Sequence, residues 1–185
     1  MKKFQNLVKY LIGFIVCFAL RLIPFRPPNV EPIMTTTMPF GKKWGWVAGG
    51  FFAAASIILF DLVHPTPGFS RLGVWTLITA AMYGLVGIVA GLYLQKQKET
   101  KIRHYVGFSV IATLAYDFVT GPIMSSIVWK MPFSVALIGQ IPFTLWHLGG
   151  NIVFALLLSP SLYHWVVSNR NLELSSLLAR LKVSA

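Results

Sequence analysis

Long runs of apolar residues are the feature that most constrains this chain. Each run is about long enough to cross the hydrocarbon core of a bilayer, which is about 30 Å thick and takes roughly 20 helical residues. Lipid offers the backbone no hydrogen-bond partners, and the runs lack the alternation of polar and apolar residues that barrel strands carry. The sequence therefore predicts an all-α integral membrane bundle of six transmembrane helices, one of them short or broken.

Composition argues against a soluble domain. Of the 185 residues, 56% are hydrophobic and only 11% are charged, whereas soluble domains carry about 25% charged residues. The formal charge of +11 could suggest nucleic acid, but the basic residues lie almost wholly between and beyond the apolar runs, as topology signals do. We therefore expect membrane lipid around the chain and no nucleic-acid partner. The lone cysteine, Cys17, lies inside an apolar run and can form no intrachain disulfide.

Prolines, glycines and polar runs divide the chain into helices. The first apolar run could pass for a signal peptide, but it lacks a clear small-x-small cleavage site, so we expect it to be retained. We expect a single transmembrane domain with a cytoplasmic tail, whose leucines suit a membrane-surface helix or a cap on the bundle. The expected helices cover about residues 7–24, 30–41, 44–63, 73–94, 105–128 and 135–165, and the tail covers 168–185.

Residues 29–43, with the sequence NVEPIMTTTMPFGKK, lie between the first two apolar runs and are short and polar for a membrane span. They form either an extramembrane loop or a short, broken segment that crosses while packed among other helices. If the stretch crosses and the N-terminus is cytoplasmic, most lysines and arginines fall inside. Without that crossing, the best arrangement leaves Lys2, Lys3 and Lys9 outside. We therefore expect a multi-pass protein of the cell membrane with both termini cytoplasmic.

Ionisable residues at membrane depth are the first candidates for function, because each costs about 2.5 kcal/mol or more in hydrocarbon. Glu31 lies in irregular, proline-rich chain, and Asp117 has mostly apolar residues on either side. Asp61 is close to a helix end, where it can reach water. Asp117 shares a helix face with Thr120 and Gly121. The alternative to a ligand contact for Asp117 is a hydrogen bond to a neighbouring helix.

The last long helix carries a polar stripe at helical spacing, made of Gln140, Phe143, Thr144, His147 and Asn151. The stripe could face a ligand cavity, or it could provide interhelical hydrogen bonds worth about 0.6 kcal/mol each. Asn151 fits the second interpretation better. The candidate substrate-binding residues are Asn29, Glu31, Asp117, Thr120, Gln140, Phe143, His147 and Asn151.

Several chemistries have no support in the sequence. No cluster of His, Cys or Asp has the spacing of metal ligands, so we expect neither a metal nor another cofactor. Neither a GxSxG motif nor a P-loop occurs, so we do not expect an enzyme, and ATP must be bound by another subunit if it energises transport. Small residues four apart, such as Gly13 and Cys17, let helices approach closely, either within the chain or against a partner membrane subunit.

Three segments, RLIPFRPPNVEPI, AYDFVTGPI and GQIPFTLWHLGGNIVFALLLSPSL, resemble the substrate-specific S components of energy-coupling factor (ECF) transporters. The resemblance covers about Arg21 to Leu162. It implies a six-helix protein that captures a vitamin or similar micronutrient outside the cell and topples in the membrane to deliver it. It also implies a gate at Pro24–Glu31, a transmembrane coupling subunit and two cytoplasmic ATPase subunits. Many S components dock the coupling subunit through helix-1 alanines four apart, and the nearest equivalent here is Gly13 and Cys17.

The leading hypothesis is therefore a ligand-capture subunit of an importer, and no substrate-defining motif names its substrate. One alternative is a membrane-embedded enzyme that uses His147 and Asp117 as acid and base. The other is a structural or assembly subunit without a small ligand, in which the polar residues only hold the bundle together.

Overall fold

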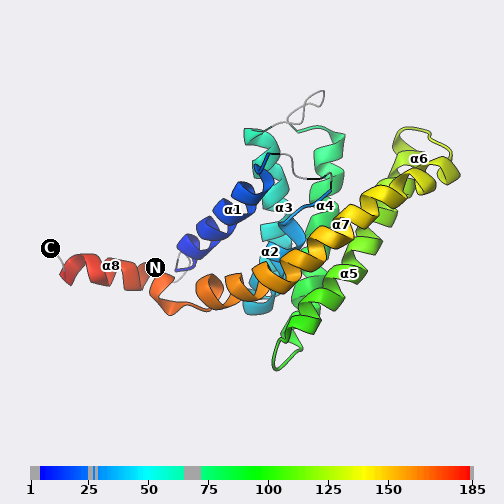
Figure 1. Ribbon diagram of the computed structural model, residues 1–185. Coiled ribbons are helices and arrows are strands. Elements are labelled where there is room, and N and C mark those ends of the chain that lie inside the picture. The colour runs from blue at the N-terminus through cyan, green and yellow to red at the C-terminus, as the bar shows by residue number, and fades with distance from the viewer. Residues whose placement is uncertain (1–4, 25–26, 28, 65–71, 184–185) are drawn as a thin grey trace.

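The computed structural model describes residues 5–24, 27, 29–64 and 72–183, and no strand occurs in those ranges. The prediction of an all-α fold is confirmed (Figure 1). The α-helices are α1 (Leu7–Arg21), α2 (Ile33–Trp44), α3 (Trp46–Val63), α4 (Val74–Gln95), α5 (Ile102–Phe118), α6 (Met124–Val128), α7 (Phe133–Leu162) and α8 (Leu174–Val183). The described residues also form two π-helical turns, η2 (Val119–Ile123) and η3 (Tyr163–Val167), and a 3-10 turn, η4 (Arg170–Leu172).

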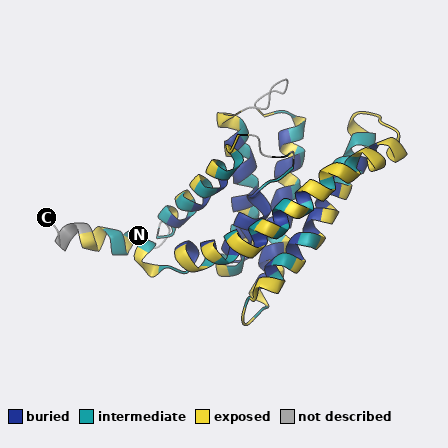
Figure 2. Cartoon of the chain, viewed as in Figure 1, coloured by how far each residue is buried: buried dark blue, intermediate teal, exposed yellow. Residues whose placement is uncertain are grey.

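In the described part of the chain, four helical runs are long and apolar enough to cross a membrane, as in a multi-pass membrane protein. They are Trp46–Val63, Val74–Gln95, Ile102–Val128 and Phe133–Val167. The helices α1 and α2 have only 15 and 12 residues, fewer than the roughly 20 of an ordinary span. Large apolar side chains cover the outside of the bundle, and Figure 2 shows exposed residues along the outer side of α7. A lipid environment explains this exposure, which water would oppose.

The helix α2 lies in the middle of the bundle, packed against α3, α4 and α7 (Figure 1). Every residue from Ile33 to Gly41 is buried, although this segment has the most polar sequence of the expected spans. The hydroxyls of Thr35 and Thr36 each donate to the carbonyl of Pro32 at 2.9 Å, so these polar groups are satisfied within the helix itself. Most of the stretch 29–43 is therefore a packed helix rather than a loop. This helix begins at Ile33 rather than near residue 30.

Glycines let α2, α3 and α4 approach at backbone distance. Gly45 has a φ of +91°, which suits glycine, and it separates α2 from α3. A Cβ added to Gly87 would collide with the carbonyl oxygen of Gly49, and one added to Gly91 would lie 2.5 Å from the Cα of Trp46. Such small-residue contacts are how helices pack closely in membranes.

The pair Gly13 and Cys17 faces the inside of the bundle, and both residues are buried. A Cβ on Gly13 would collide with the ring of Phe40, which stacks on Phe52 with ring centroids 4.1 Å apart. This face of α1 is therefore covered by α2 and α3. The spacing therefore serves packing within the chain, and docking of a partner subunit by this pair stays a prediction.

The Gly121–Pro122 sequence, expected to break or kink its helix, lies in the π-helical turn η2, which joins α5 to α6. Proline has no backbone N–H to donate, and π-helical turns accommodate such a site while the helix continues. The turn brings Gly121 directly against the side chain of Gln140 on α7.

The start of α1 is tied to the segment that follows α7. The ammonium of Lys9, almost fully buried, donates to the carbonyl of Val167 at 3.2 Å and pairs with the carboxylate of Glu173 at 3.5 Å. The backbone N–H of Leu174 donates to the carbonyl of Gln5 at 3.1 Å. From there α8 extends away from the other helices (Figure 1).

Candidate functional site

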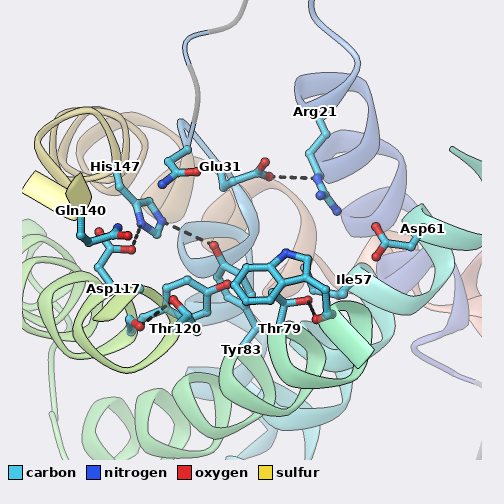
Figure 3. A pocket seen from close by; sticks show the side chains of 14 residues that line it. Arg21, Glu31, Ile57, Asp61, Thr79, Tyr83, Asp117, Thr120, Gln140 and His147 are labelled. Carbon is cyan, nitrogen blue, oxygen red and sulfur yellow. Dashed lines mark hydrogen bonds and ion pairs between the residues drawn. The ribbon is translucent and has the colours of Figure 1, made fainter. Parts of the chain in front are cut away.

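A polar cavity of about 250 Å³ lies where the end of α1, the start of α2, and α3, α4, α5, η2 and α7 converge (Figure 3). These elements are far apart in the sequence, and the cavity exists only because the bundle assembles. Its lining residues are Arg21, Asn29, Glu31, Ile57, Asp61, Trp75, Thr79, Tyr83, Tyr116, Asp117, Thr120, Gly121, Gln140 and His147.

A buried hydrogen-bonded chain runs across one wall of the cavity. The carboxylate oxygen Oδ1 of Asp117 accepts from Nδ1 of His147 at 2.7 Å, and both side chains are no more than 3% exposed. An ionised carboxylate only accepts, so Nδ1 carries the proton. In a neutral imidazole the other nitrogen, Nε2, then accepts from the hydroxyl of Tyr83, which lies 3.4 Å away. The ring of Tyr116 packs edge-on against His147, which holds the imidazole in place.

The second oxygen of Asp117, Oδ2, is buried and has no hydrogen-bond partner among the described residues. A buried acceptor without a partner costs about 1–3 kcal/mol, so native proteins rarely keep one without a reason. Asp117 lines the cavity. A donor on a bound molecule would satisfy this oxygen.

An ion pair closes the other side of the cavity. Nε of Arg21, at the end of α1, lies 2.9 Å from Oε2 of Glu31, just before α2. The guanidinium of Arg21 also lies over the ring of Phe60, 3.7 Å from its centroid. Asp61 accepts from the hydroxyl of Thr76 at 2.7 Å.

The connection between α1 and α2 delivers two predicted residues to the cavity. Asn29 has a φ of +63°, a conformation that asparagine tolerates better than most residues. It lines the cavity together with Glu31. Within the predicted gate Pro24–Glu31, residues 25, 26 and 28 lie outside the described part of the chain.

The turn η2 and α7 supply the remaining polar wall. The hydroxyl of Thr120 donates to the carbonyl of Tyr116 at 2.9 Å, an intrahelical bond that leaves its lone pairs available to accept. The amide of Gln140 donates to Thr144 at 3.4 Å and packs on Gly121. Six of the expected candidates therefore meet at one cavity: Asn29, Glu31, Asp117, Thr120, Gln140 and His147.

Two candidates lie elsewhere. Phe143 is 44% exposed on the outer face of α7. Asn151 is fully buried outside the cavity lining, and its amide donates to the hydroxyl of Thr113 on α5 at 2.8 Å and lies 3.8 Å from the sulfur of Met34 on α2. Asn151 therefore joins three helices, as its interhelical interpretation requires. Neither residue lines the cavity, so we remove both from the candidate site.

Sequence patterns alone did not identify several of the lining residues. Thr79 and Tyr83 are one turn apart in α4, a spacing that could have placed them on one face. Arg21 is one of the basic residues that read collectively as topology signals, yet it ends an apolar helix beside the segment that carries Glu31. Trp75 lies at the start of α4, where tryptophan usually marks the membrane interface.

No group of three or more His, Cys, Asp and Glu side chains in the described part of the chain could hold a metal ion. No protein-family model, curated protein or solved structure matches the chain. The site's own geometry therefore carries the functional argument.

Proposed function

We propose that this chain is the membrane-embedded substrate-binding subunit of an ECF-type importer, which captures a vitamin or similar small heterocyclic micronutrient from outside the cell. The observation that carries the proposal is the convergence of polar side chains from distant segments on one cavity between helices. Such a cavity, with a few convergent polar groups and aromatic walls, is where membrane-embedded ligand sites form.

The packing of α2 supports six crossings with both termini cytoplasmic. A buried polar helix at membrane depth is tolerated when other helices surround it, and α2 is surrounded by α3, α4 and α7. Counting α1 and α2 with the four longer runs gives the six spans of the proposal. Lys42 and Lys43 at the end of α2 then lie on the cytoplasmic side of the cell membrane, as the positive-inside rule favours.

The lining suggests how a ligand is held. Asp117 and Glu31 accept hydrogen bonds from amino, amide or hydroxyl groups, Gln140 both donates and accepts, and Tyr83 and Tyr116 offer aromatic surface. The gate would be the α1–α2 connection, because it delivers Asn29 and Glu31 to the cavity. Energy would come from partners, a transmembrane coupling subunit and two cytoplasmic ATPase subunits, since the sequence has no P-loop.

The test is native mass spectrometry of the purified chain in detergent, followed by identification of any co-purified small molecule. We expect a one- or two-ring compound that rebinds the stripped protein. The Gln140→Leu variant should lose most of the affinity, whereas Phe143→Leu, on the outer face of the same helix, should keep it. If neither a co-purified molecule nor a panel of soluble vitamins and nucleobases binds, the proposal fails.

The chain of Asp117, His147 and Tyr83 favours a second candidate, a membrane-embedded enzyme. A carboxylate that orients a histidine is a recurring acid–base arrangement. In the enzyme, His147→Ala would abolish turnover of a bound molecule while leaving its binding largely intact. In the binding subunit the same variant would weaken binding, and the bound molecule would be recovered chemically unchanged from the wild-type protein.

A further inference from the structure

We infer that the ligand of this cavity is a small cation, a one- or two-ring nitrogen heterocycle that carries a positive charge. The inference rests on the proposed function and names the charge class of the substrate. It follows from the charges of the lining, from the pairing of its arginine, and from one unpartnered carboxylate oxygen.

The described lining carries more negative than positive groups. Its acidic side chains are Glu31, Asp61 and Asp117, and its basic side chains are Arg21 and His147. Negative charge is in excess whether or not His147 is protonated. Because charges are weakly screened in a partly enclosed, low-dielectric site, the excess favours a positive guest.

The described lining has one arginine, Arg21, whose Nε is paired while its buried Nη1 has no hydrogen-bond partner among the described residues. Its guanidinium pairs with Glu31 at 2.9 Å and covers the ring of Phe60. An anionic ligand at Arg21 would meet the carboxylate of Glu31, and the same lining also holds Asp61 and Asp117. Like-charge juxtaposition of this kind rejects a ligand more effectively than weak attraction selects one.

Asp117 supplies the independent observation that points to a ligand. Its residue is only 2% exposed, its Oδ1 is bonded to His147, and its Oδ2 has no partner within the described chain. The carboxylate is thus held in place by one oxygen and left open at the other. A charged N–H donor suits such an oxygen best, because charge-assisted hydrogen bonds are the stronger kind.

Aromatic side chains and size narrow the guest further. Trp75, Tyr83 and Tyr116 line the cavity, and the rings of the two tyrosines lie 4.4 Å apart. Aromatic faces attract cations and stack on flat rings. The volume of about 250 Å³ is just below the roughly 300–1,000 Å³ of sites for drug-sized ligands. One or two rings fit this space.

Matched probes test the charge class directly on the wild-type chain in nanodiscs. The one-ring set is 1-methylnicotinamide, nicotinamide and nicotinate, which carry positive, zero and negative charge on nearly the same frame. The two-ring set is N-methylquinolinium, quinoline and quinoline-3-carboxylate. We expect calorimetry to show that the cation of at least one set binds about tenfold or more tightly than its neutral and anionic partners. The charge of any molecule that co-purifies is read by native mass spectrometry in parallel.

Two carboxylate variants connect the preference to the cavity. Asp117→Asn should weaken cation binding about tenfold or more with little effect on a neutral ligand. Asp61 is half-buried, and Asp61→Asn should weaken cation binding by a smaller factor. This variant replaces Asp117→Asn as the test if Asp117→Asn fails to fold. Glu99→Gln removes an exposed carboxylate beyond the other end of α4 and should change nothing.

The outcomes separate this inference from the proposed function. A neutral or anionic ligand that binds as well as a cation, or cation binding that survives both carboxylate variants, overturns the charge class and leaves a binding subunit. A co-purified cation supports the inference even if the six probes fail. Absence of any bound small molecule, from the cell or from the probe sets, overturns both.

Discussion

Asp117 of α5 and His147 of α7 lie 30 positions apart in the sequence, and their side chains meet in a buried hydrogen bond of 2.7 Å. This contact joins two long helices and also fixes one wall of the cavity. Tyr83 and Tyr116 contact the imidazole and help to hold its orientation. Structure and proposed binding therefore depend on the same pair, and experiments must separate the two roles.

A double-mutant cycle measures the contact itself. Asp117→Leu leaves Nδ1 of His147 buried without its acceptor, and His147→Phe leaves the carboxylate without its donor. Each single variant should lower the free energy of unfolding by about 1–3 kcal/mol. The double variant should cost less than the sum, because neither polar partner is then stranded. Denaturant unfolding in detergent gives the values, and strict additivity would contradict a direct interaction.

Substitutions of Asn151 and Gln140 should have different effects on stability and on ligand affinity, because only Gln140 lines the cavity. Asn151→Leu removes the bond to Thr113 outside the cavity, so it should lower stability by about 0.6–2 kcal/mol and leave ligand affinity unchanged. Gln140→Leu changes a lining residue and should lower affinity with a smaller effect on stability. Thermal unfolding and ligand titration of both variants provide the comparison. Loss of affinity in Asn151→Leu at unchanged melting temperature would return that residue to the candidate site.

Gly87 is expected to tolerate no side chain. A valine Cβ there meets the backbone of Gly49, which cannot turn aside as a side chain can, so α3 and α4 must separate. Overpacking typically costs about 1–3 kcal/mol and here acts on a backbone contact. Gly87→Val should therefore yield little monodisperse protein in size-exclusion chromatography. Gly107→Ala is the matched control, since a Cβ at Gly107 meets nothing within 4 Å in the described structure. A well-folded Gly87→Val protein would show that the two helices are packed less closely.

Lys9 should hold the start of α1 to the segment that follows α7. Lys9→Met removes the donor to Val167 and the partner of Glu173. The free energy of unfolding should fall by about 1–3 kcal/mol, because a buried carbonyl and a half-buried carboxylate lose their partner. Amide hydrogen exchange should rise across residues 163–174 more than in α3 or α4. Lys43→Met changes an exposed lysine at the end of α2 and serves as the control. Equal exchange in both variants would mean that the two segments are held by other contacts.

Hydropathy predicted the long helices well. The transfer of the apolar runs of α3, α4, α5 and α7 into lipid depends only on the composition of each run. The observed helix ends differ by a few residues from the predicted ones, because local capping rather than hydropathy determines where a helix stops. For example, α1 ends at Arg21, before Pro24. Gly13 and Cys17, which pack against α2 and α3, show the limit of spacing rules. Small residues four apart predict a close contact, but not the surface against which it forms.

Within the polar stripe of α7, only part faces the cavity. His147 and Gln140 line it, whereas Asn151 is buried among other helices and Phe143 is exposed on the outside, although their spacing predicts one shared face. A stripe of this length drifts around the helix, because the repeat of 3.6 residues does not coincide with steps of three and four. The rotation of α7 against α5 and α2 decides which residues share the cavity, and that rotation is a property of the packed bundle.

The sequence by itself determined that the chain is helical, that its long runs suit a membrane, and that Glu31, Asp117 and His147 are costly to bury without a purpose. The tertiary structure alone decided that α2 is surrounded, that Asp117 holds His147, and that Arg21 and Tyr83 complete the cavity. The physical reason is the range of the forces involved. Transfer into lipid acts on each segment separately, whereas a cavity depends on contacts between segments that only close packing brings together.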